Sequence, residues 1–163
     1  KEQKATMIVE HIKYNITEGE YDSDIFTATK RTDLTKAYPA SKHITDYVFT
    51  DGLTKENGEM KFAKALDEAQ EVCVYAKLPR SFHIPTPVGN YAPDWAIAFN
   101  KETVKHIFFI AETKGSMDSM ELRGIEDAKI KCAKRLFNEM SSSDLKYHEV
   151  KSYEELLEIM QKL

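Results

Sequence analysis

The sequence has no long hydrophobic run, few cysteines and no excess of positive charge. No apolar stretch approaches the ~18 residues that a membrane-spanning helix needs, so we expect no membrane partner. Cys73 and Cys132 lie far apart among apolar neighbours, which predicts buried free thiols and a reducing cytoplasm. The net charge of −4 predicts weak non-specific binding to DNA, because that binding comes from Lys and Arg contacts to phosphates.

Several catalytic motifs are also missing. The sequence has no GxxxxGK[ST] phosphate loop, no HExxH or CxxC pair for zinc and no GxSxG nucleophile elbow. These absences argue against ATP hydrolysis by this chain, zinc chemistry and serine-hydrolase chemistry. The histidines are scattered, and we expect each to be a surface or strand residue: His11, His43, His83, His106 and His148.

The apolar pattern predicts one compact α/β domain with a central mixed sheet flanked by helices. We expect residues 1–42 to be a helical and irregular lead-in and residues 43–163 to be the domain proper, with a short strand at 44–49 first. The elements that follow should have the order α-β-β-β-α-β-α. Their expected ranges are 60–70, 72–78, 95–99, 104–111, 125–140, 147–150 and 153–163.

Charged side chains lie at the ends of two neighbouring predicted strands. Asp94 opens one strand, and Glu112 closes the next, two residues before Lys114. On an extended strand this spacing places Glu112 and Lys114 on one face, and a hairpin can bring Asp94 beside them. Two carboxylates form a hard oxygen site suited to Mg²⁺. The set predicts phosphodiester hydrolysis, with Lys114 orienting the attacking water or offsetting developing negative charge.

A simpler interpretation makes Asp94 a turn residue after Pro93, and Glu112 and Lys114 a solvated pair. Against it, Glu112 follows the apolar run 106–111, and a carboxylate at the end of a buried strand needs a partner.

Glu59 and Thr113 are further candidate metal ligands. Glu59 precedes Phe62 and Ala63 of the first apolar helix stripe by three and four residues, which places it on the inward side. Alternatively, Glu59 is a first-turn acid favoured by the helix dipole. Thr113 stands between Glu112 and Lys114.

The longer predicted helix has a lysine in the middle of its apolar face. At ~100° per residue, the apolar arc is centred on Lys129. The arc consists of Ile125, Cys132, Ala133, Leu136 and Met140. Lys129 is therefore a candidate phosphate contact and catalytic residue beside the carboxylates. The alternative is a lysine that only covers core surface with its apolar stem.

A long ordered series of motifs resembles a known family. The segments are VYAKLP at 74–79, FHIPTPVG at 82–89, YAPDWA at 91–96 and FIAETKG at 109–115, then Leu122, Arg123, Glu126, Lys129, Ile130, Lys131 and Cys132. In this order they resemble the C-terminal PD-(D/E)XK endonuclease domain of type III restriction enzyme Res subunits. The match covers about residues 46–137.

The resemblance implies a restriction-endonuclease-like fold and the activity of a type III site-specific deoxyribonuclease. It implies Mg²⁺, for which Mn²⁺ can substitute, and double-stranded DNA as substrate. The implied partners are Mod methyltransferase subunits and a helicase-like motor region of the same protein, which alone would need ATP.

Two other functions are compatible with the pattern. The chain could be a non-catalytic docking module with a nuclease-like fold, which the intact set of Asp94, Glu112 and Lys114 disfavours. It could also be a metal-dependent nucleotide hydrolase. Metal titration and a comparison of plasmid DNA with nucleotides separate these functions from DNA cleavage.

Overall fold

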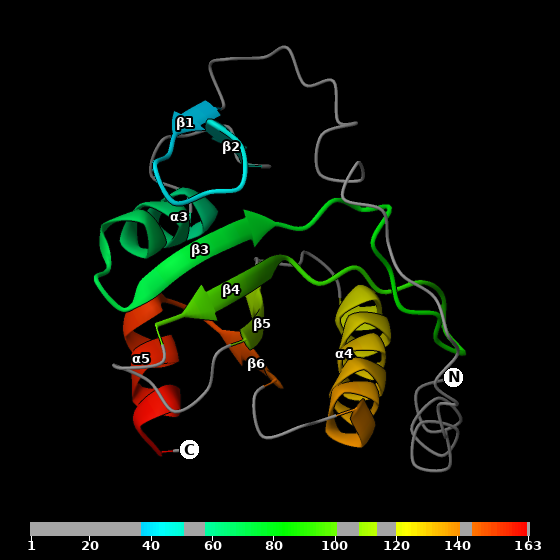
Figure 1. Cartoon of the computed structure of the whole chain (residues 1–163). Helices are drawn as coiled ribbons and strands as arrows, with labels where there is room; N and C mark the ends of the chain where they lie inside the picture. Colours follow the sequence, from blue (N-terminus) through cyan, green and yellow to red (C-terminus); the bar gives the residue numbers. More distant parts are fainter. Residues whose placement is uncertain (1–36, 51–57, 101–107, 114–119, 141–144, 163) are drawn as a thin grey trace.

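A computed structural model describes residues 37–50, 58–100, 108–113, 120–140 and 145–162 of the chain, with side chains over 37–50, 58–100, 124–138 and 146–162 (Figure 1). In chain order its elements are β1 (Ala37–Pro39), β2 (Tyr47–Phe49), α3 (Gly58–Glu68), β3 (Val72–Lys77), β4 (Trp95–Phe99), β5 (Phe108–Thr113), α4 (Met120–Met140), β6 (Leu145–Val150) and α5 (Tyr153–Lys162). None of the helices within these ranges has the length and apolarity to cross a bilayer.

The central sheet has four strands in the order β3-β4-β5-β6. β3 pairs antiparallel with β4, and β4 pairs antiparallel with β5, whereas β5 and β6 run parallel. Parallel neighbours need a long crossover connection, and α4 supplies it. The predicted central mixed sheet is therefore confirmed.

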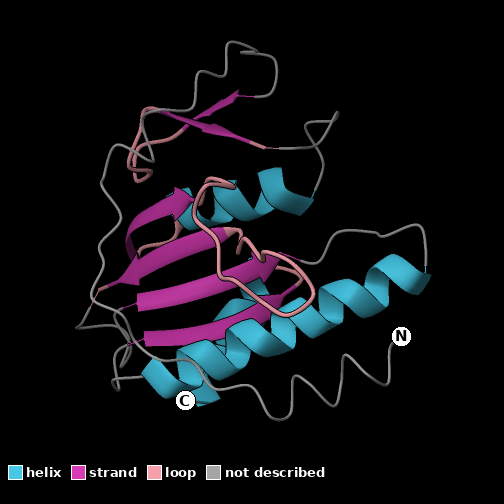
Figure 2. Cartoon of the chain, turned by 90° about the vertical axis from the view of Figure 1, so that its right-hand side faces the viewer, coloured by secondary structure: helices cyan, strands magenta, loops and turns pink. Residues whose placement is uncertain are grey.

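Helices cover both faces of this sheet. α3 and α5 pack on one face, where they form the larger hydrophobic cluster with β3 and β4. α4 crosses the other face and packs against β6 (Figure 2). The domain thus has three layers, with the sheet in the middle.

Trp95 of β4 is at the centre of the larger cluster. The side chains of β4 alternate between buried and partly exposed, as expected for a strand whose two faces meet different partners. Trp95 is 0% exposed, and its ring centroid lies 5.4 Å from that of Phe62 and 6.2 Å from that of Tyr75. These aromatic contacts join α3, β3 and β4.

The connection between β3 and β4 forms a second cluster with α4. Ile84 and Tyr91 exchange backbone hydrogen bonds of 2.7 and 2.9 Å, which close the loop 84–91. The Tyr91 hydroxyl lies 2.5 Å from the Tyr147 hydroxyl of β6. Phe137 of α4 stacks on the Tyr147 ring, with centroids 5.2 Å apart. The loop is thereby held against the α4 side of the sheet.

The β1–β2 hairpin is attached to the end of α3. Asp67 accepts backbone hydrogen bonds from Ser41 at 2.9 Å and from Lys42 at 2.8 Å. Burial acts to raise the pKa of Asp67, but these hydrogen bonds outweigh it and leave the pKa below its usual value. The ammonium group of Lys42 also donates to the carbonyl of Ala69, just after α3.

Some boundaries differ from the sequence-based expectations. β5 was expected to end at Ala111, but it continues through Thr113 because it pairs in parallel with β6. α4 begins at Met120 rather than at Ile125. β1 was not predicted, since three residues ending in proline carry no strand signal and become a strand only by pairing with β2. The division at residue 42 stays a prediction, and residues 1–36 of the expected lead-in lie outside the described residues.

Two burial predictions were wrong. Cys132 is buried, but Cys73 is exposed. The β3–β4 register shifts between Val72 and Val74, and this bulge turns Cys73 away from the core. Ile125 is 40% exposed because the first turns of α4 extend beyond the sheet (Figure 2).

Candidate active site

Asp94 stands directly before β4. The N–H of Leu78 donates to the carbonyl of Asp94 at 2.7 Å, which continues the β3–β4 pairing one step past Lys77 and Trp95. Pro93 and Trp95, on either side of Asp94 in the chain, are both buried. These contacts fix the backbone of Asp94 at the end of the sheet.

Glu112 lies in β5 at the same end of the sheet. Trp95 pairs with Ala111 in the antiparallel β4–β5 register. Asp94 directly precedes Trp95 and Glu112 directly follows Ala111, so both residues lie next to the last pair of this register. Thr113 follows in β5. The side chains of Glu112 and Thr113, and all of Lys114, lie outside the described residues.

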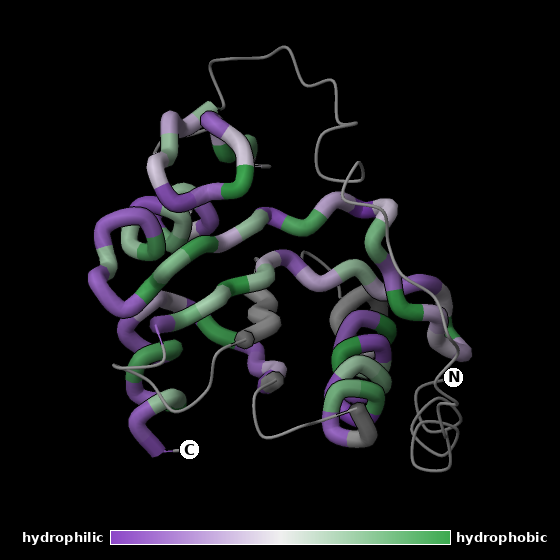
Figure 3. Tube along the Cα trace, in the orientation of Figure 1, coloured by the Kyte–Doolittle hydropathy of each residue, from purple (hydrophilic) through white to green (hydrophobic). Residues whose placement is uncertain are grey.

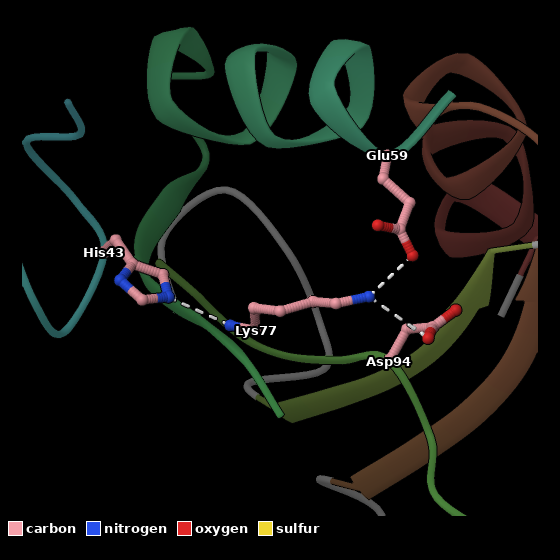
Figure 4. Close-up of polar contacts among 4 residues, drawn as sticks. All are labelled: His43, Glu59, Lys77 and Asp94. Atoms are coloured by element: carbon pink, nitrogen blue, oxygen red, sulfur yellow. Dashed lines mark hydrogen bonds and ion pairs between the residues drawn. The ribbon is translucent and has the colours of Figure 1, made fainter. Parts of the chain in front are cut away.

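Lys77, the last residue of β3, joins two of the candidate metal ligands. Its Nζ lies 2.7 Å from Oε1 of Glu59 and 3.2 Å from Oδ1 of Asp94 (Figure 4). Glu59 comes from the first turn of α3, so three elements contribute to the cluster. The side chains of Lys77, Glu59 and Asp94 are only 15%, 23% and 20% exposed. Water and salt therefore screen these charges less than they screen surface ion pairs.

Two further contacts hold Lys77. Its backbone N–H donates to Nε2 of His43 at 3.0 Å, and its Nζ lies 4.9 Å from the centroid of the Trp95 ring. Because Nε2 accepts a hydrogen bond, the proton of the neutral His43 ring is assigned to Nδ1, which lies 3.0 Å from the Thr45 hydroxyl. Burial lowers the pKa of His43, which favours this neutral form.

The two carboxylates keep Lys77 charged. Burial alone would lower the pKa of its ammonium group, but the nearby charges of Asp94 and Glu59 outweigh burial and leave the pKa above its usual value. Lys77 is therefore a cation at neutral pH, and it balances one of the two negative charges in the cluster.

The arrangement fits a divalent metal ion. Glu59 and Asp94 already converge on one cation, the ammonium group of Lys77, and carboxylate oxygens are the ligands that Mg²⁺ prefers. Among the described side chains, no three His, Cys, Asp or Glu residues form a metal-binding group. A third protein ligand could come from Glu112, which follows Ala111, the β5 partner of Trp95, at the same end of the sheet. Water and a substrate phosphate would complete the shell.

Lys129 lies in the middle of the buried face of α4. At ~100° per residue it falls between buried positions on either side, and Figure 3 shows hydropathy alternating around this helix. Its side chain is 21% exposed, and its Nζ lies 3.6 Å from Oε2 of Glu126. Gly89 lies close to the stem of Lys129, since a Cβ atom at position 89 would be 3.7 Å from Cε of Lys129. Gly89 also has a φ of 116°, in the left-handed region that favours glycine. Among the described side chains, no ion pair joins Lys129 to Glu59 or Asp94.

Comparison with known proteins decides the family. A family profile described as an endonuclease domain matches residues 41–153, which is most of the chain. The chain belongs to this endonuclease domain family.

Two curated relatives of the endonuclease domain are Res subunits of type III restriction-modification enzymes. They are the EcoPI Res subunit of Escherichia phage P1 and the EcoP15I Res subunit of Escherichia coli, each 38% identical over 78 residues. The matched segment is 47% of this chain but only 8% of each relative. The predicted resemblance to a Res endonuclease domain is confirmed. No solved structure matches the chain.

Reasoning from the sequence gave Lys77 of the endonuclease domain no role. Lys77 closes the VYAK stretch of β3 directly before Leu78 and Pro79. The available signal was a lysine within an apolar strand, because a buried ammonium group needs a negative partner. The sequence does not show which carboxylates Lys77 contacts, since they come from α3 and from the residue directly before β4.

Glu149 was also missed. It pairs in register with Glu112 on the neighbouring strand β6. Its side chain is 17% exposed, and its Oε1 lies 2.5 Å from Nζ of Lys134 on α4. Glu112 and Glu149 therefore lie side by side on neighbouring strands, and Lys134 offsets the negative charge at the Glu149 end of this pair.

Proposed function

We propose that this endonuclease domain hydrolyses DNA phosphodiester bonds with Mg²⁺, for which Mn²⁺ can substitute, and that it has a PD-(D/E)XK fold. The observation that carries the proposal is the convergence of Glu59 and Asp94 on one cation, at 2.7 and 3.2 Å from Nζ of Lys77. This cation lies at the end of the sheet where Trp95 of β4 pairs with Ala111 of β5, the residues that adjoin Asp94 and Glu112 in the chain.

Each candidate residue has a role in this proposal. Asp94 and Glu112 are the main metal ligands, and Glu59 and Thr113 are further ligands. The bound metal would polarise the scissile phosphate and lower the pKa of a water molecule. Lys114 orients that water or offsets the negative charge that develops in the transition state, and Lys129 contacts a phosphate.

We further propose that the domain is the cleavage module of a type III restriction-modification enzyme that works in the cytoplasm. The similarity to two Res subunits supports this context. The substrate is double-stranded DNA, and the partners are Mod methyltransferase subunits and a helicase-like motor region that uses ATP. Such partners would supply the DNA affinity that a domain with a net charge of −4 lacks.

The direct test is nicking of supercoiled plasmid by a large excess of the 163-residue chain across a titration of Mg²⁺, repeated with Mn²⁺. We expect slow nicking that depends on the metal, and no hydrolysis of free nucleotides. If the folded chain does not nick the plasmid at any metal concentration in the titration, the result would contradict the proposal and favour a docking module. Hydrolysis of nucleotides but not of DNA would favour a nucleotide hydrolase.

Lys129→Met tests the proposed phosphate contact. The change keeps the apolar stem and removes the charge, so we expect cleavage to fall by roughly tenfold or more, equivalent to ~1.4 kcal/mol of transition-state stabilisation. The unfolding midpoint should change little, because the partly exposed pair with Glu126 contributes little stability. Single-turnover nicking and thermal unfolding measure the two effects.

Lys131→Met is the matched control, since Lys131 is exposed on the same helix. Its cleavage rate should stay close to that of the unmodified chain. If Lys129→Met also cleaves at that rate, Lys129 only covers the core and contacts no phosphate.

A further inference from the structure

We propose that Lys77 is a positioning residue of the cleavage site and that its ammonium group competes with a divalent metal ion for the carboxylates of Glu59 and Asp94. Its ammonium group holds the carboxylates of Glu59 and Asp94 together, and a divalent cation must displace it in order to bind. This inference rests on the metal-dependent function proposed above.

The ammonium group and a divalent metal ion need the same carboxylate oxygen atoms. Nζ of Lys77 lies 2.7 Å from Oε1 of Glu59 and 3.2 Å from Oδ1 of Asp94, as Figure 4 shows. Mg²⁺ binds carboxylate oxygens at about 2.0–2.1 Å and requires near-octahedral geometry. A metal ion between the same two oxygens would overlap with Nζ, so the ammonium group and the metal exclude one another.

The backbone of Lys77 is fixed, whereas its side chain can move. The residue pairs with Trp95 in the β3–β4 ladder, and its N–H donates to His43 at 3.0 Å. Its flexible four-carbon stem can therefore swing from a fixed base.

The indole ring of Trp95 offers the displaced ammonium group a second partner. The ring centroid lies 4.9 Å from Nζ, within the range of a cation–π contact. Trp95 is fully buried and held by Phe62 and Tyr75, so the ring stays in place when the carboxylates move to the metal. Lys77 can thus leave the carboxylates without losing all favourable contacts.

Competition with the metal differs from a purely structural ion pair in one measurable respect. A structural pair affects the stability of the metal-free domain and leaves metal affinity unchanged. A competing ammonium group weakens metal binding, because the metal must break its contacts with both carboxylates. Removing the ammonium group should therefore destabilise the metal-free domain and strengthen metal binding at the same time.

The experiment measures Mn²⁺ binding and thermal unfolding of the 163-residue chain without DNA, using Lys77→Met. We expect the dissociation constant for Mn²⁺ to fall by roughly fivefold or more, about 1 kcal/mol. The metal-free unfolding midpoint should fall by several degrees, at roughly 2–4 °C per kcal/mol for a domain of this size. Saturating Mn²⁺ should restore most of this loss.

Lys64→Met is the control. Lys64 lies on α3 with its Nζ 5.7 Å from the centroid of the Tyr38 ring, so the control removes the same charge and a similar ring contact. Its Mn²⁺ affinity should match that of the unmodified chain. Lys77→Gln retains hydrogen-bond donors without the charge, and it replaces Lys77→Met if that variant does not fold.

The outcomes separate this inference from the function on which it rests. Unchanged or weaker Mn²⁺ binding in both Lys77 variants would overturn the role of Lys77 while leaving metal-dependent cleavage in place. An unmodified chain that binds no Mn²⁺ would overturn both proposals. Tighter binding in the Lys77 variants alone supports displacement.

Discussion

Asp94→Ala, Glu112→Ala and Lys114→Ala are each expected to abolish DNA cleavage by the endonuclease domain. The rate should fall by roughly 1000-fold or more, which corresponds to about 4 kcal/mol of activation free energy. The physical reason is that the two carboxylates would hold the metal that polarises the phosphate, while the lysine orients the attacking water. Single-turnover plasmid nicking at saturating Mg²⁺ measures the effect.

The experiment must distinguish a loss of catalysis from a loss of folding, because Oδ1 of Asp94 also lies 3.2 Å from Nζ of Lys77. Asp94→Asn keeps the size of the side chain, and it should be as inactive as Asp94→Ala while its circular dichroism matches that of the unmodified chain. Asp127→Ala removes an exposed carboxylate from α4 and should leave nicking unchanged. Near-normal nicking by Glu112→Ala would contradict the assignment.

The largest expected effect on stability is that of Trp95→Ala. Deleting a fully buried aromatic side chain typically costs about 3–5 kcal/mol, a large share of the ~5–15 kcal/mol that stabilises a typical domain. Trp95 joins α3 to the sheet through Phe62 and contacts Tyr75 of β3, so its loss removes packing from three elements. Urea unfolding followed by circular dichroism is the suitable measurement, because the chain has one tryptophan and the variant loses its fluorescence.

Two variants serve as controls for Trp95→Ala. Trp95→Phe retains a ring at the centre of the cluster and should lose less stability than Trp95→Ala. Val74→Ala alters a neighbouring strand at a side chain that is 38% exposed, and it should change stability by roughly 0.5 kcal/mol or less. A loss below about 1 kcal/mol in Trp95→Ala would show that the domain does not depend on this cluster.

Much of the fold follows from local patterns in the sequence. The predicted strand at 95–99 coincides with β4, because alternation between buried and partly exposed residues is a property of the strand itself. The helices α3, α4 and α5 were predicted from their apolar stripes, with boundaries that differ by up to five residues for α4. The candidate ligands at strand ends, Asp94 and Glu112, were found because a charge beside an apolar run is visible without knowledge of the fold.

Glu59 shows how far such reasoning extends. Its inward position was predicted from its spacing to Phe62 and Ala63 within one helix. The structure brings Glu59 and Asp94 to the same ammonium group, that of Lys77. The helix period predicts which side of α3 faces the core, but it contains no information about which residue of β3 contacts Glu59 there.

The sequence by itself determined the kinds and order of the elements from α3 to α5, and the strand ends that carry Asp94 and Glu112. Only the tertiary structure decided which strands are neighbours, and it thereby placed Lys77 between two carboxylates and Glu149 beside Glu112. The physical reason is the separation along the chain of the residues that determine each feature. Periodicity and strand-end charge depend on residues a few positions apart, whereas an ion pair between α3 and β3, or the parallel register of β5 and β6, depends on how the whole chain packs.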